Sequence, residues 1–155
     1  MSDELPMQLV DHSFPTKTSI VHELGHLFAS TVFAPRTDGI AFFARCPGTI
    51  ALASFSKDKV TASRRISIAV AGAVATHDAA VAGGLGEQPC PTEVFNANND
   101  ELFPEFCGDR ATVREFTIGL GADKKDATII RAINRTRREL ECIRPVDDLL
   151  QRHCL

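Results

Sequence analysis

Apolar residues recur at intervals of three and four in the first part of the chain, the spacing of one face of an α-helix. This pattern predicts a helix over residues 16–33, with a threonine near its start and Pro35 as its stop. The apolar positions of this helix are Ile20, Val21, Leu24, Leu27, Phe28, Val32 and Phe33. Gly25 interrupts them. Because glycine costs about 1 kcal/mol against alanine inside a helix, we expect a close neighbour there.

The pattern changes after this helix. Two short apolar runs at 40–45 and 49–55, separated by Cys-Pro-Gly, predict a β-hairpin. A long alanine-rich helix is expected over 60–82, and its small residues at 69–75 would let another helix approach closely. The rest of the pattern predicts a loop at 83–98, a short or kinked helix that starts at 98–101, and helices at 110–118 and 123–143.

Together these elements predict an α+β fold, a mostly helical single domain with a small β-sheet packed beside the helix at 16–33. The domain is expected to cover residues 1–155, with a loose lead-in at 1–15 and a C-terminal tail at 145–155. A chain of 155 residues is long enough for one real core, and its 44% hydrophobic and 24% charged residues are ordinary for a globular protein.

The net charge of -3 gives no sign of a nucleic-acid partner, and the basic strip at 131–138 is typical of a solvated helix face. The five cysteines are odd in number and include no C-x-x-C pair, which disfavours a disulfide framework or a cysteine zinc site and favours a reducing cytoplasm. We expect neither a signal peptide nor a membrane span, because the longest apolar region, at 66–81, is broken by polar residues.

The first helix carries the sequence His22-Glu23-Leu24-Gly25-His26, an H-E-x-x-H motif that random placement would give at odds of about one in a hundred. Histidines four apart lie on one face of a helix and can aim two imidazoles at one point. Glu23 can then reach a water at that point, which is the arrangement of a zinc hydrolase. The alternative is a half-buried helix whose histidines bond to backbone or solvent.

A zinc site needs a third protein ligand from elsewhere in the chain. Asp100 is our first choice, because it is expected at a helix start after a long loop. It could instead be a simple N-cap. His77 and Asp78 come next, as a ligand or as a pair that orients a ligand imidazole, and the alternative for both is a polar helix end facing solvent.

The string from Ile20 to His26 resembles the zinc site of the FtsH-type peptidases, whose membrane-bound members carry an ATPase ahead of the protease. The segment at 71–75 (Ala-Gly-Ala-Val-Ala) is similar to the Gly-Gly-Arg-Ala-Ala segment of that family, and an Asn-Asp pair follows at 99–100. The resemblance covers roughly residues 18–143. It implies His22, His26 and Asp100 as Zn²⁺ ligands, with Glu23 as the general base of peptide-bond hydrolysis.

This chain departs from the family pattern at Leu24, where alanine is usual, at 77–78, where two glutamates are usual, and at Pro104, which would disturb the helix after the aspartate. We expect neither an ATPase nor a membrane segment ahead of the motif. We therefore expect peptide or unfolded protein substrates, and a separate ATPase or a homo-oligomer as partner.

Two other interpretations stay open. The ImmA/IrrE-type regulatory metallopeptidases have a similar motif but place a glutamate ligand soon after it, and residues 34–56 contain no glutamate. The other is a non-catalytic binding module that retains a peptidase fold.

Overall fold

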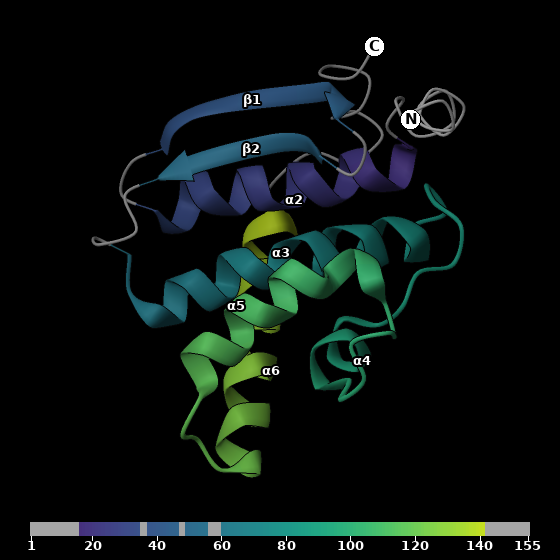
Figure 1. Cartoon of the computed structure of the whole chain (residues 1–155). Helices are drawn as coiled ribbons and strands as arrows, with labels where there is room; N and C mark the ends of the chain where they lie inside the picture. Colours follow the sequence, from purple (N-terminus) through teal and green to yellow (C-terminus); the bar gives the residue numbers. More distant parts are fainter. Residues whose placement is uncertain (1–15, 35–36, 47–48, 56–59, 142–155) are drawn as a thin grey trace, which may run out of the picture.

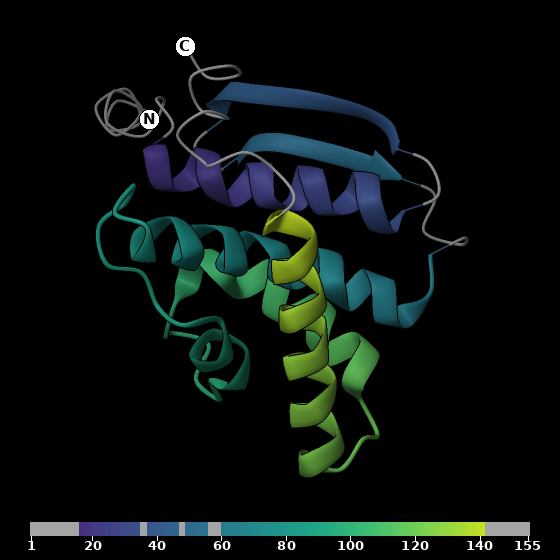
Figure 2. The same ribbon diagram turned by 180° about the vertical axis from the view of Figure 1, so that it is seen from behind.

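The computed structural model describes residues 16–34, 37–46, 49–55 and 60–141, with 37–46 and 49–55 described by their backbone alone. The elements follow one another in the order α2 (Lys17–Phe33), β1 (Thr37–Cys46), β2 (Thr49–Phe55), α3 (Ala62–Val81), α4 (Pro91–Asn96), the 3₁₀ turn η2 (Pro104–Phe106), α5 (Cys107–Thr117) and α6 (Ala122–Glu141). Both views show the hairpin lying along α2 on the side away from α3, while α6 crosses α3 steeply (Figures 1 and 2).

Side-chain caps fix the starts of the two central helices. The Thr16 hydroxyl accepts a hydrogen bond from the Ser19 N–H at 3.1 Å, and the Thr61 hydroxyl accepts one from the Arg64 N–H at 3.3 Å. Each satisfies a backbone donor that has no partner inside its helix. The predicted helices at 16–33 and 60–82 are therefore confirmed to within two residues at each end.

Helix α3 is the centre of the fold. Its residues Val70, Ala71, Ala73 and Val74 are fully buried on several faces, as expected for a helix enclosed by others. One hydrophobic cluster joins α3 to α4, α5 and α6, and a second joins it to the C-terminal half of α2. In the described residues, no helix is long and apolar enough to cross a membrane.

The predicted α+β class is wrong, and the fold is all-α. Every residue whose side chain is described lies in a helix or in a connection between helices. The backbone does pair as an antiparallel hairpin where two strands were expected, with Ile40 opposite Ala53. However, a two-stranded hairpin is at best marginally stable by itself, and the elements that enclose the described core are helices.

Two further corrections concern the region between α3 and α5. Part of the predicted loop at 83–98 is the short helix α4, which starts with Pro91 in the first turn, where its missing N–H costs nothing. No helix starts at 98–101. The Asn99 side chain instead accepts a hydrogen bond from the Glu101 N–H at 2.9 Å, which makes a turn, and the next helix begins only after Pro104.

Candidate metal centre

The two motif histidines lie on the face of α2 that packs against α3. Gly25, between them, permits the contact: a Cβ at this position would lie 2.6 Å from the Ala71 carbonyl oxygen and 2.8 Å from the Ala75 Cβ. The close neighbour predicted for this glycine is therefore the backbone of α3. The small residues predicted to admit another helix are confirmed in that role, since Gly25 of α2 lies against Ala71 and Ala75 of α3.

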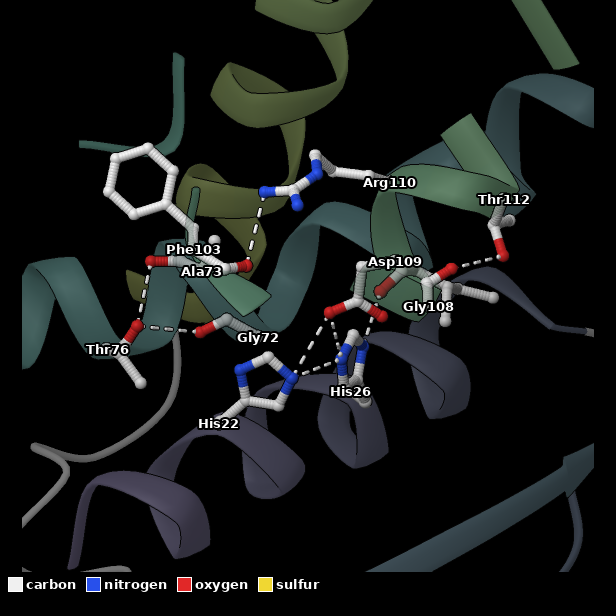
Figure 3. Close-up of polar contacts among 11 residues, drawn as sticks. His22, His26, Gly72, Ala73, Thr76, Phe103, Gly108, Asp109, Arg110 and Thr112 are labelled. Atoms are coloured by element: carbon white, nitrogen blue, oxygen red, sulfur yellow. Dashed lines mark hydrogen bonds and ion pairs between the residues drawn. The ribbon is translucent and has the colours of Figure 1, made fainter. Parts of the chain in front are cut away.

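Three potential ligand atoms converge beside this contact (Figure 3). The Nε2 atoms of His22 and His26 are 3.0 Å apart, and Asp109 Oδ2 lies 3.2 Å from each of them. Asp109 comes from the first turn of α5, so the site joins two helices that are far apart in the sequence. The three atoms form a nearly equilateral triangle.

A backbone carbonyl of α3 fixes the ring of His26. The Ile68 carbonyl oxygen lies 2.8 Å from His26 Nδ1 and accepts the hydrogen bond that this nitrogen donates. The bond orients the ring so that Nε2 points toward His22 Nε2 and Asp109 Oδ2. Metal-binding histidines are commonly oriented in this way, with the second ring nitrogen donating to a carbonyl or a carboxylate.

The electrostatics of the site are dominated by Asp109. Burial disfavours charge on this carboxylate and on the His26 imidazole, but their mutual attraction outweighs it, so the pKa of Asp109 lies well below its usual range and that of His26 rises to about 9. In the metal-free protein His26 is therefore an imidazolium at neutral pH. Burial raises the pKa of Glu23, although the charges of His26 and His22 partly oppose the rise.

The triangle fits a tetrahedral metal ion. Four ligands at the usual zinc–nitrogen distance of about 2.05 Å lie about 3.3 Å from one another. The three observed separations, 3.0, 3.2 and 3.2 Å, are within a few tenths of an ångström of that value. Two imidazoles and a carboxylate are also a donor set that zinc accepts, and no fourth protein ligand joins them among the residues that the structure describes.

The structure does not bring Asp100 to this centre. Its carboxylate is 64% exposed and pairs with the Arg114 guanidinium at 2.7 Å, which lowers the pKa of Asp100. Its backbone carbonyl accepts a hydrogen bond from the buried Arg110 side chain at 3.2 Å. The structure therefore brings Asp109, and not the predicted Asp100, to the two histidines.

His77 and Asp78, the alternative candidates, are not at the centre either. Both Asp78 carboxylate oxygens accept from Arg137 Nε, at 3.0 and 3.2 Å, and this pair ties the end of α3 to α6. His77 Nδ1 lies 3.7 Å from the Asp78 carboxylate. Within the described part of the chain, the group that could hold a metal is His22, His26 and Asp109.

Asp109 was not predicted, because one helix was expected to start at 98–101 and the next at 110, one residue after Asp109. The helix expected at 110–118 is α5, which starts three residues earlier, at Cys107, so Asp109 lies in its first turn, where an acid is favourable.

Comparison with known proteins adds no relative: no protein-family model, no curated protein and no solved structure matches this chain.

Proposed function

We propose that this chain binds a zinc ion through His22, His26 and Asp109 and hydrolyses peptide bonds. The observation that carries the proposal is the triangle of donor atoms, with edges of 3.0–3.2 Å, beside the glutamate of an H-E-x-x-H motif. An ion pair that merely linked α2 to α5 would need one histidine. Convergence of two imidazoles and one carboxylate oxygen on a single point is what a metal ion requires.

Glu23 has the properties of a general base in this scheme. It directly follows His22 on α2, and its half-buried carboxyl group interacts with the charges of both histidines and Asp109. Its pKa is raised toward neutral pH. This suits a group that must take a proton from the attacking water and then give it to the leaving amine. The chemistry that zinc supplies when bound is Lewis acidity, which lowers the pKa of water and polarises a carbonyl.

Asp109 has a second role besides ligation. With two neutral imidazoles alone, the half-buried site would carry the full charge of +2 of the zinc ion. The Asp109 carboxylate lowers this net charge to +1. The same set of two histidines and a carboxylate also serves iron(II), so the identity of the metal is part of the proposal. The motif, with its glutamate beside the first histidine, favours zinc and hydrolysis over redox chemistry.

The substrate, partner and location follow from the resemblance to FtsH-type peptidases and are proposed with it. We propose peptides or unfolded protein segments as substrates, a separate ATPase or a homo-oligomer as the partner for folded ones, and the cytoplasm as the compartment. Cys90 and Cys107 are free thiols, as a reducing compartment would keep them.

The decisive experiment compares the wild-type chain with Glu23→Gln, which keeps the shape of the side chain and removes its basicity. Both proteins should contain about one zinc per chain when prepared without added metal. Only the wild type should cleave an unfolded protein such as casein. Zinc in both proteins with cleavage by neither would support a non-catalytic metal-binding module, and absence of metal affinity in the wild type would refute the proposal.

A further inference from the structure

Helix α3 meets His22 at a residue without a side chain. A Cβ placed on Gly72 would lie 2.6 Å from His22 Cε1 and 2.7 Å from both His22 Nδ1 and Nε2. The imidazole therefore rests against the bare backbone of Gly72, as the close-up shows (Figure 3). Phe106 contacts the same ring, with the two ring centroids 5.1 Å apart.

Helix α3 contacts the two histidines in different ways. His26 is anchored by a hydrogen bond to the Ile68 carbonyl, whereas His22 Nδ1 has no such anchor among the described residues. Ile68 and Gly72 are four residues apart, one turn of α3, and so are His26 and His22 on α2. Because the helices run antiparallel here, each histidine meets one of these two positions on α3.

We propose that Gly72 is a positioning residue for His22: the missing side chain leaves the space in which the imidazole can aim Nε2 at the other two donors. A methyl group at position 72 would have to move the ring atoms from 2.6–2.7 Å to an ordinary contact of at least 3.4 Å, a displacement of about 0.7 Å. A metal site tolerates deviations of about 0.2 Å in its ligand distances. The ring would therefore leave the triangle while α3 stayed helical.

This inference rests on the proposed metal site, and the first test uses Co²⁺ as a probe whose absorption reports tetrahedral coordination. Wild type, Gly72→Ala and His22→Ala are titrated, with Gly108→Ala as the matched control. Gly108 precedes Asp109 on α5, and a Cβ there would meet nothing within 4 Å. Gly108→Ala should bind like wild type. Gly72→Ala should bind at least about tenfold more weakly, with an absorption spectrum shifted toward that of His22→Ala.

The second test measures the contact without metal, by a double-mutant cycle on thermal unfolding. Gly72→Ala should lower the midpoint more, or raise it less, in the wild-type background than in the His22→Ala background, where the ring is gone. An equal shift in both backgrounds would place the contact elsewhere and overturn the inference. This comparison holds even if Gly72→Ala alone is poorly folded.

The outcomes separate the two proposals. If wild type binds Co²⁺ and folded Gly72→Ala binds it equally well with the same spectrum, the positioning role is wrong and the metal site stands. If the wild-type chain binds no Co²⁺ or Zn²⁺, the metal site is wrong, and the positioning role falls with it.

Discussion

Gly25→Ala offers the sharpest test of how helix packing builds the candidate metal centre. The added methyl group would lie 2.6 Å from the Ala71 carbonyl oxygen and 2.8 Å from the Ala75 Cβ, and contacts below 3.0 Å are not tolerated. Both neighbours belong to α3, and the oxygen is backbone that cannot rotate away. To reach an ordinary 3.4 Å contact, α2 and α3 must separate by about 0.8 Å at this point.

Two opposing effects set the size of the change in stability. Alanine favours the helix over glycine by up to about 1 kcal/mol, and overpacking of this kind costs about 1–3 kcal/mol. Gly108→Ala adds the same methyl group in the first turn of a helix without the clash, because the space around Gly108 is open. We therefore expect Gly25→Ala to have a free energy of unfolding about 1–3 kcal/mol below that of Gly108→Ala.

Urea unfolding of the metal-free proteins, followed by circular dichroism, measures this difference. Equal stabilities of the two variants would refute the close approach of α2 to α3. The same separation would draw His26 away from the Ile68 carbonyl, so Gly25→Ala should also bind zinc more weakly than Gly108→Ala.

Two further predictions concern the charges of the centre. Asp109→Asn should lower zinc affinity by at least about a hundredfold, whereas Asp100→Asn should leave it unchanged, and competition titration against a chelator would contradict our ligand set if the order were reversed. The pKa of His26 in the folded protein is about 9, above its ordinary 6.5, so its stabilisation of the metal-free protein is complete below pH 6.5 and is lost as the pH rises through 9. Unfolding free energies should fall over this range by up to about 3 kcal/mol, and a flat profile in wild type, or the same slope in Asp109→Asn, would count against the His26–Asp109 pair.

The parts of the fold that local sequence determines were predictable. A threonine near the start of α2, the apolar stripe of this helix and the small residues of α3 predicted two helices that pack closely, and the first of them carries both histidines. The fold class was less accessible. Apolar runs at 40–45 and 49–55 give the same signal whether the hairpin is part of a core or a ribbon beside one helix, and only tertiary packing distinguishes the two.

Asp109, the third member of the proposed ligand set, could not be predicted because its position depends on a turn. Asp100 and Asp109 are both acids near an expected helix start, and choosing between them requires the path of the backbone at 99–106. That path includes Phe103 in the left-handed region, with φ of 51°. The sequence does not predict this conformation, because it is rare for a bulky residue. Arg110 stabilises it by donating hydrogen bonds to the carbonyls of Asp100 and Phe103.

Arg110 therefore explains why one aspartate, and not the other, faces the histidines. The buried Arg110 side chain extends from α5 to the preceding loop and donates a hydrogen bond to the Asp100 carbonyl. The Asp100 carboxylate is exposed and pairs with Arg114. Asp109 is the next residue toward the helix start, so its side chain projects about 100° away around the helix and points to α2. Because one buried arginine ties this loop to α5, the sequence signal for the proposed metal site lies partly in Arg110, a residue that does not bind a metal itself.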